Sequence, residues 1–200
     1  MLGANKDDTL YETLSAPLNN GAGQWVFSGK TRAGDIRRGL IGFDIAAGLP
    51  AGTTVTGVTL TMNMSRSIAG DSEVGLQLVL ADWQEGAAKA GGNEGQGAAA
   101  GQGDVTWTQS SFDALDWTTP GGDFSPKAST AVTVEGIGSY TWGSTSQLVA
   151  DVQNWLDNPA TNFGWLLLGD ESRSQTAMRF DSRDNNTEEN RPVLMVEYTP

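Results

Sequence analysis

The 200-residue sequence contains no cysteine and no histidine. These absences exclude disulfides, thiolate zinc sites, a cysteine nucleophile, a Ser-His-Asp triad and every imidazole metal ligand. No run of about 18 consecutive apolar residues is present, so the sequence predicts no membrane-spanning helix. Lysine is also scarce, and charged residues make up only 18% of the chain.

The few charges are unbalanced, with 24 Asp and Glu against 12 Lys and Arg and a net charge of −12 at pH 7. A charge of this sign argues against nucleic acid and anionic membranes as partners. The low charge content, together with seven tryptophans, argues against disorder. Because the length suits one core, we expect a single domain over residues 1–200.

Alternation of apolar and polar residues dominates the chain and is clearest at 58–64 and 74–80. Further strands are predicted at 9–14, 24–28, 38–46, 131–135, 164–168, 177–182 and 193–199. About nine or ten short antiparallel strands with Gly-rich turns are typical of an all-β fold. We therefore expect a jelly-roll β-sandwich.

One segment has helical spacing. Ser144-Thr145-Ser146-Gln147 fits a capping box with Ser144 as the N-cap, and Asn158-Pro159 ends the segment. Its apolar residues fall on one face: Leu148, Val152, Trp155 and Leu156. The pattern predicts a short amphipathic helix near 145–157 that covers the core.

Residues 86–103 are rich in Gly and Ala and show no periodicity. Such a segment predicts a long flexible loop, or one that only its contacts hold in place. It could be a surface insertion or a lid over a binding face.

Two strands are expected to present arginines opposite an apolar face. Arg38 and Asp44 alternate with apolar residues, as do Arg179, Asp181 and Arg183. If these strands are neighbours, the result is an Arg/Asp cluster. It is either a ladder of salt bridges or a clamp for the carboxylates of uronate sugars, because Arg binds carboxylates bidentately. We take Arg38, Arg179 and Arg183 as candidate ligand contacts. The net charge would repel a polyanion, so binding would need a local positive patch or bridging calcium.

The tryptophans are candidates for stacking on sugar rings. Trp117 and Trp142 lie beside Gly-rich turns, so they are the better candidates for exposure and ligand contact, with packing in the core as the alternative. The others are expected to pack in the core: Trp25, Trp83, Trp107, Trp155 and Trp165.

Without His and Cys, only oxygen ligands remain for a metal, and these suit Ca²⁺. No Asp-x-Asp-x-Asp-Gly loop is present. Asp7, Asp8 and Glu12 near the first strand and Glu197 in the last are the candidate ligands of a structural Ca²⁺. Alternatives are Asp170, Glu171, Asp181 and Asp184. No organic cofactor is expected.

Several short motifs follow one another in a familiar order. They include Asp8-Thr9-Leu10-Tyr11-Glu12, Arg37-Arg38-Gly39-Leu40-Ile41-Gly42-Phe43-Asp44-Ile45, Leu49-Pro50-Ala51-Gly52, Trp83-Gln84-Glu85-Gly86, Asp104-Val105-Thr106-Trp107, Asn162-Phe163-Gly164-Trp165, Arg179-Phe180-Asp181-Ser182-Arg183 and Arg191-Pro192-Val193-Leu194. In this order the chain resembles the DNRLRE-type domain of secreted bacterial and archaeal proteins, over nearly its whole length. Asp184 stands where that family often has Glu.

The resemblance implies a jelly-roll β-sandwich that accompanies polysaccharide-degrading enzymes or surface-anchored repeats. Some members bind uronate polysaccharides such as alginate. We therefore expect a non-catalytic extracellular module that binds an acidic polysaccharide. The first residues carry no signal-peptide pattern, whereas the Gly-, Thr- and Trp-rich composition is typical of secreted β-domains. We expect a secreted or cell-surface protein of bacterial type whose leader is absent.

Two alternatives remain open. The domain could be a structural or adhesive module of a surface protein or filament, which self-associates and has no sugar ligand. It could also be a polysaccharide lyase or hydrolase. A lyase would have to use Tyr11, Tyr140 or Tyr198 in place of the missing histidine, and no local motif marks a pair of catalytic carboxylates.

Overall fold

The computed structural model describes residues 1–13 and 15–200. Antiparallel strands dominate it: β1 (Leu2–Gly3), β2 (Lys6–Tyr11), β3 (Leu18–Asn19), β4 (Trp25–Lys30), β5 (Ile36–Gly42), β6 (Thr54–Ser67), β7 (Ser72–Val79), β8 (Ala98–Ala99), β9 (Gln109–Ser111), β10 (Leu115–Asp116), β11 (Phe124–Val134), β12 (Gly138–Trp142), β13 (Trp165–Leu168), β14 (Met178–Asp181) and β15 (Val193–Thr199). The helices are α1 (Ile45–Gly48) and α2 (Ser146–Asp157), with short 3-10 turns at Pro159–Thr161 and Glu188–Asn190.

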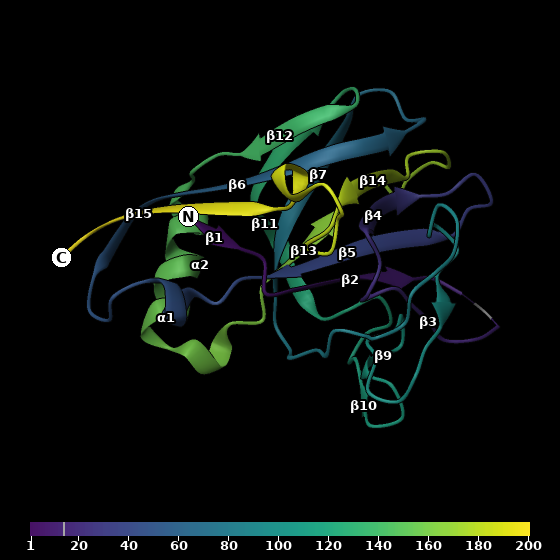
Figure 1. Cartoon of the computed structure of the whole chain (residues 1–200), viewed down its shortest axis with the longest axis horizontal. Coiled ribbons are helices and arrows are strands. Elements are labelled where there is room, and N and C mark those ends of the chain that lie inside the picture. The colour runs from purple at the N-terminus through teal and green to yellow at the C-terminus, as the bar shows by residue number, and fades with distance from the viewer. Residues whose placement is uncertain (14) are drawn as a thin grey trace.

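One large sheet curls on itself, in the order β1-β15-β6-β14-β4-β5-β13-β7-β11, with β12 on β6 and β2 on β5 (Figure 1). Strand β4 joins the two halves, because Trp25–Ser28 pair with β14 while Gly29 and Lys30 pair with β5. The predicted all-β, sandwich-like architecture is confirmed. More strands are present than expected, mainly because several very short ones and β12 carry no clear alternation.

Most strands lie close to their predicted positions, and β15 coincides with the predicted 193–199. Strand β2 begins three residues earlier than predicted and ends at Tyr11. The last residue of that predicted strand, Leu14, lies outside the described residues.

The main core lies between the two halves of the sheet. Ile41 and Leu76 come from one half, and Leu60 and Phe180 from the other. Helix α2 closes one end of this core, where Trp155 packs on Trp165 with ring centroids 4.5 Å apart (Figure 1). The amphipathic helix near 145–157 is thus confirmed, with its apolar face buried.

The cap of α2 differs from the prediction by one residue. The N-cap is Thr145, whose side chain accepts a hydrogen bond from the backbone N–H of Leu148 at 3.0 Å. The predicted cap, Ser144, instead accepts from the backbone N–H of Val58 in β6. Because the Ser144 hydroxyl is used in this tertiary contact, Thr145 caps the helix instead.

A second apolar cluster covers the outer face of the half-sheet formed by β2, β5, β13 and β7. Leu10, Leu40 and Leu166 lie on that face, and Trp83 and Trp117 from the connection between β7 and β11 pack over them. This half-sheet is consequently buried on both sides.

Buried polar groups hold the Gly/Ala-rich segment 86–103 against β2 and β3. The carboxylate of Asp8 accepts from the Asn19 amide at 2.6 Å and from the backbone N–H of Gly86 at 2.9 Å. A Cβ at Gly86 would come within 1.9 Å of the Asn19 side chain. Only glycine fits there, so the small residues of this segment allow the backbone to approach the buried network.

Candidate functional site

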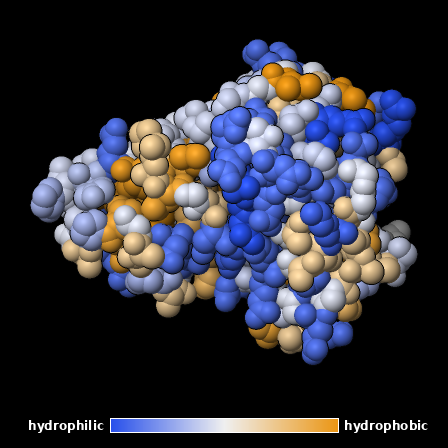
Figure 2. Space-filling model, viewed as in Figure 1, coloured by the Kyte–Doolittle hydropathy of each residue, from blue (hydrophilic) through white to orange (hydrophobic). Residues whose placement is uncertain are grey.

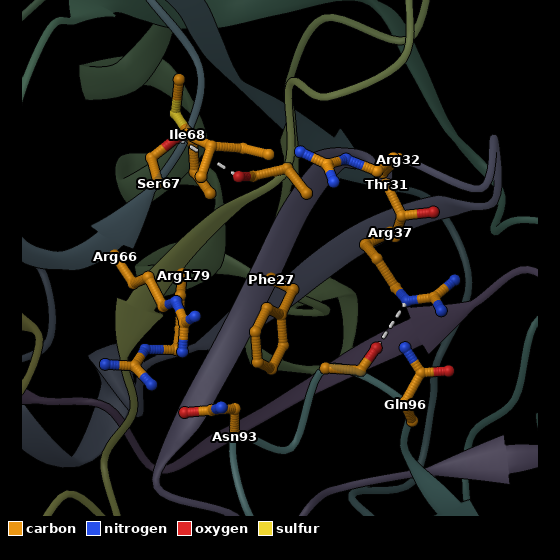
Figure 3. Close-up of a pocket in the computed structure, with 13 residues that line it drawn as sticks. Phe27, Thr31, Arg32, Arg37, Arg66, Ser67, Ile68, Asn93, Gln96 and Arg179 are labelled. Carbon is orange, nitrogen blue, oxygen red and sulfur yellow. Dashed lines mark hydrogen bonds between the residues drawn. The ribbon is translucent and has the colours of Figure 1, made fainter.

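A pocket of about 340 Å³ opens where β4, β5, β14 and the end of β6 meet residues 93–96 (Figure 3). Four of the eight arginines of the chain line it: Arg32, Arg37, Arg66 and Arg179. No Asp or Glu is among its lining residues. The pocket is therefore a local positive patch on a protein of net charge −12.

The arginines of the chain divide into two groups by their partners. Arg38, Arg173, Arg183 and Arg191 each form an ion pair with a carboxylate. Over residues 1–13 and 15–200, no carboxylate lies within 4.0 Å of the guanidinium groups of the four pocket arginines. The charges of the exposed Arg32 and Arg66 and of the half-buried Arg179 are therefore available to a ligand, whereas Arg37 is buried.

Two of these arginines face each other across a strand pair. Arg66 in β6 is the direct register partner of Arg179 in β14. Like charges directly opposite in an antiparallel pair are destabilising. The Arg179 guanidinium lies 3.9 Å from the centroid of the Trp25 ring, and its Nε donates to Ser65 Oγ at 3.1 Å. Stacking and this hydrogen bond hold Arg179 in place without neutralising it.

The partial burial of Arg179 lowers its pKa, and the charge of Arg66 acts in the same direction. The carboxylates of Asp181 and Glu94 act in the opposite direction from farther away. An anion bound between the two arginines would relieve their repulsion.

Arg37 and Arg32 form the other side of the pocket, and Figure 3 shows Phe27 between the two pairs. Arg37 is 3% exposed and donates only to backbone carbonyls, those of Gly95, Glu12 and Ile36. Burial lowers the pKa of Arg37. Arg32 is exposed, and its Nε donates to the side chain of Gln175 at 3.3 Å.

A buried carboxylate shapes the wall formed by residues 93–96. Glu94 has a left-handed backbone, with φ of 61°, and is 4% exposed. Its Oε2 accepts from Asn20 Nδ2 at 2.9 Å and from the Trp25 backbone N–H at 3.2 Å. Its carbonyl accepts from the Tyr11 hydroxyl at 3.0 Å. These bonds fix its neighbours, Asn93 and Gly95, at the pocket.

Strand β4 lies between β5 and β14, so the condition for a cluster of Arg38, Arg179 and Arg183 is not met and the cluster does not form. Arg38 binds Glu171 bidentately at 2.8 and 2.9 Å. Arg183 binds Glu85 in the same way at 2.7 and 2.6 Å. Only Arg179 lies in the pocket.

The acidic residues predicted to join that cluster also lie apart. Asp44 caps α1 by accepting from the backbone N–H of Ala47. Asp181 is 2% exposed and accepts from the Asn63 amide at 2.6 Å. Both carboxylates therefore make structural hydrogen bonds in which no arginine takes part.

Of the two interpretations of Trp117 and Trp142, packing is correct and their role as exposed ligand contacts is wrong, because they are 4% and 0% exposed. The indole N–H of Trp117 donates to the carbonyl of Thr106, and that of Trp142 to the carbonyl of Val74. Neither ring has a free face for stacking on a sugar. Gly121 and Gly122 near Trp117 are buried, whereas Gly143 beside Trp142 is exposed, so an exposed turn does not imply an exposed neighbouring ring.

The predicted calcium ligands do not come together. Asp7 and Asp8 are each 1% exposed in β2, and their oxygens accept from N–H groups. Glu12 accepts from the backbone N–H of Ile36, and Glu197 lies in β15. Within the described part of the chain, no group of three or more acidic side chains is arranged to hold a metal ion. A structural calcium ion therefore remains a prediction, for which the described residues provide no set of ligands.

Burial strongly affects two of these carboxyl groups. It raises the pKa of Asp8 to about 7, although four N–H donors favour its ionised form. Burial also raises the pKa of Asp7 well above its ordinary value.

Sequence reasoning missed Arg32, Arg37 and Arg66. Alternation from Met62 and Met64, both core residues, would place residue 66 in the core. The register of β6 and β14 shifts at this point, because Met64 pairs with Phe180 and Arg66 with Arg179. Ser65 is the extra residue of a β-bulge, and it turns Arg66 to the pocket.

No protein-family model matches the chain, and no curated protein matches its sequence. The resemblance to DNRLRE-type domains therefore rests on the ordered motifs alone. Among the described helices, none is long and apolar enough to cross a membrane.

Proposed function

We propose that the arginine pocket binds carboxylates of an acidic, uronate-containing polysaccharide and that the domain is a non-catalytic extracellular binding module. The observation that carries the proposal is the direct pairing of Arg66 with Arg179 in the absence of a close carboxylate. A guanidinium matches a carboxylate with two parallel hydrogen bonds. The like-charge pair costs stability when empty and becomes favourable when a carboxylate bridges it.

The rest of the pocket suits a sugar chain. Asn93 and Gln96 place amide groups at its rim, where they can bond hydroxyls (Figure 3). Phe27 and Ile68 supply apolar surface between and beside the arginines. Ligand sites combine apolar surface with a few polar groups in this way.

The proposal of a binding module, and not an enzyme, is supported by the groups at the pocket. No carboxyl group lines it, so it has no acid and base pair of the kind that glycoside hydrolysis needs. The Tyr11 hydroxyl is buried and donates to the carbonyl of Glu94. The Tyr140 hydroxyl bonds the turn at Gly136, and Tyr198 lies half exposed on β15.

The test is affinity electrophoresis in alginate, polygalacturonate and a neutral β-glucan, each with Ca²⁺ and with a chelator. We expect both uronate polymers to retard the protein. The Arg66→Ala, Arg179→Ala double variant should lose about tenfold in affinity for each arginine removed. Retardation should also weaken as salt is added, because a charged contact at the surface is screened.

A matched control removes the same two charges elsewhere. Lys89 and Lys127 are exposed, so Lys89→Ala combined with Lys127→Ala tests net charge alone. This control should be retarded like the wild-type protein. Equal retardation of both double variants, or none of the wild type, would contradict the proposal. Loss of retardation only in chelator would identify bridging calcium as part of the site.

A second candidate function, as a structural or adhesive module, is favoured by one edge of the sheet. Strand β1 pairs only with Val193 and Leu194 of β15, and Met195 and Tyr198 beyond them are 46% and 45% exposed. Figure 2 shows apolar residues gathered near β1 on this side of the molecule. Light scattering over a range of concentrations separates the two functions, because an adhesive module would assemble and a binding module would stay monomeric.

A further inference from the structure

The arginine pocket carries more positive charge than one carboxylate can balance. Four arginines line it, and no Asp or Glu is among its lining residues. Arg32 and Arg66 are exposed and Arg179 is half-buried, so a ligand can reach three of the four guanidinium groups. A single carboxylate would leave most of this charge without a partner. The charge of the pocket therefore favours a ligand with more than one carboxylate.

The three reachable guanidinium groups have N–H donors to spare. In the described residues, Arg66 forms no hydrogen bond, and Arg179 uses only its Nε, which donates to Ser65 Oγ at 3.1 Å. Over the same residues, Arg32 also uses only its Nε, which donates to the side chain of Gln175 at 3.3 Å. The terminal nitrogens of all three arginines can therefore donate to a ligand.

These guanidinium groups lie at two positions in the pocket. Strand pairing places Arg66 directly opposite Arg179, and Arg179 directly opposite Phe27 of β4. Arg32 lies in the turn between β4 and β5, and Figure 3 shows it on the other side of Phe27. Gln175, which holds Arg32, precedes Arg179 by four residues, so these two Cα atoms are at most about 14 Å apart. A short oligosaccharide can span such a distance.

The chemistry of the carboxylate assigns a separate anion to each position. A carboxylate has two oxygens, and one guanidinium can bond both with two parallel hydrogen bonds. A carboxylate that bridges Arg66 and Arg179 has both oxygens bonded there, so Arg32 needs another one. The buried Arg37, which donates only to backbone carbonyls, adds its positive charge on the Arg32 side of the pocket (Figure 3).

We propose that the pocket binds two carboxylates from nearby residues of one polysaccharide chain, one between Arg66 and Arg179 and the other at Arg32. The ligand is then a stretch of uronates with free carboxyl groups, in contrast to single uronates scattered among neutral sugars. A volume of about 340 Å³ is small for a ligand site, so the stretch is short. This inference rests on the proposed function, because both positions belong to the arginine pocket.

The first test compares galacturonate with its trimer by isothermal titration calorimetry. The trimer should bind the wild-type protein at least about tenfold more tightly, because only the trimer places carboxylates at both positions. Arg32→Ala should lose this advantage and bind the monomer like the wild type. Arg66→Ala should weaken the binding of both, because it removes part of the bridged position.

Methyl esters separate the effect of the carboxylates from that of the sugar rings. Two polygalacturonates, each with half of its carboxyl groups esterified, differ only in whether the free groups lie in blocks or at random. In affinity electrophoresis, the blockwise polymer should retard the wild-type protein more strongly than the random one. For Arg32→Ala the two polymers should give the same retardation.

The matched control is Arg173→Ala. Arg173 is an exposed arginine outside the pocket, where it pairs with Asp170, so its removal changes the net charge by the same amount. This variant should bind monomer, trimer and both polymers like the wild type. Thermal unfolding checks the fold of Arg32→Ala, whose midpoint should stay at that of the wild type because Arg32 is exposed.

Equal affinity of the wild-type protein for monomer and trimer would overturn the site for two carboxylates and leave the uronate pocket in place. An equal affinity of Arg32→Ala and Arg173→Ala for the trimer would overturn it too, because Arg32 would then bind no carboxylate. Absence of binding to every uronate probe would overturn the proposed function itself. The two failures are therefore distinguishable.

Discussion

Arg66 faces Arg179 directly in the register of β6 and β14, and the bulge at Ser65 is what places it there. A cross-strand pair of like charges is worth roughly 0.2–1 kcal/mol of destabilisation. The protein has 24 acidic residues with which such a pair could be balanced, yet none lies within ion-pair distance in the described part of the chain. Because the pair repels in the unbound protein and would attract a bound carboxylate, its effects on folding stability and on ligand affinity should have opposite signs and can be measured separately.

The single substitution Arg66→Ala should lower affinity for a uronate polymer about tenfold. It should leave the free energy of unfolding unchanged or raise it by up to about 1 kcal/mol, because the repulsion from Arg179 is removed. Urea unfolding and affinity electrophoresis measure the two effects. A variant that is clearly less stable and binds as before would show that Arg66 serves the fold.

The stability of the protein should fall as the pH rises from about 4 to about 7. Burial raises the pKa of Asp8 to about 7 in the folded state, whereas an Asp in an unfolded chain titrates near 3.9. Between these values the folded state holds more protons than the unfolded state, so its advantage is lost as the pH rises. Asp7, whose pKa burial also raises, acts in the same direction.

Urea unfolding at pH 5 and pH 7.5, at constant ionic strength, measures this change. We expect the free energy of unfolding to be on the order of 2–4 kcal/mol lower at pH 7.5. Asp8→Asn should flatten the profile, because the titrating group is gone. An unchanged profile in this variant would assign the pH dependence to other carboxyl groups.

Glu94→Ala should destabilise the protein and weaken uronate binding together. The substitution leaves the buried Asn20 amide and the Trp25 backbone N–H without their acceptor, at a cost of about 1–3 kcal/mol for each. Glu94→Gln keeps one acceptor oxygen and should have a smaller effect. Hydrogen exchange of residues 91–97 should speed up most in the alanine variant, and unchanged exchange would show that these bonds do not hold the wall.

Thr145→Ala should lower the free energy of unfolding by about 1 kcal/mol, because α2 loses its N-cap. Ser146→Ala, at the next residue, should have almost no effect, since its exposed side chain forms no cap. Urea unfolding of both variants measures the difference. Equal losses at the two positions would contradict the assignment of the cap to Thr145.

Local sequence patterns predicted the parts of the fold whose signals are local. The alternation at 193–199 matches β15, and the helical spacing of Leu148, Val152 and Trp155 matches α2. Ile41, Phe43 and Ile45 lie in the core as expected, but the strand predicted over 38–46 ends at Gly42, and Ile45 begins α1. These patterns follow from the period of a strand or a helix, which depends only on neighbouring residues.

The candidate site depends on contacts between distant residues, so only Arg179 of its four arginines was anticipated. Arg38 was expected beside Arg179, but Glu171, 133 positions away in the sequence, neutralises it. Trp142 was a candidate ligand contact, but it packs against Phe180 from another strand. No local pattern contains this information.

By itself, the sequence determined the all-β class, the positions of the main strands and helix, and the absence of cysteine and histidine chemistry. The tertiary structure alone decided which arginines keep a free charge and which buried acceptor, Gln77 Oε1, lacks a donor. The physical reason is that strand periodicity is a property of the backbone. Charge pairing and hydrogen-bond satisfaction, in contrast, depend on which residues the folded chain brings within a few ångströms of each other.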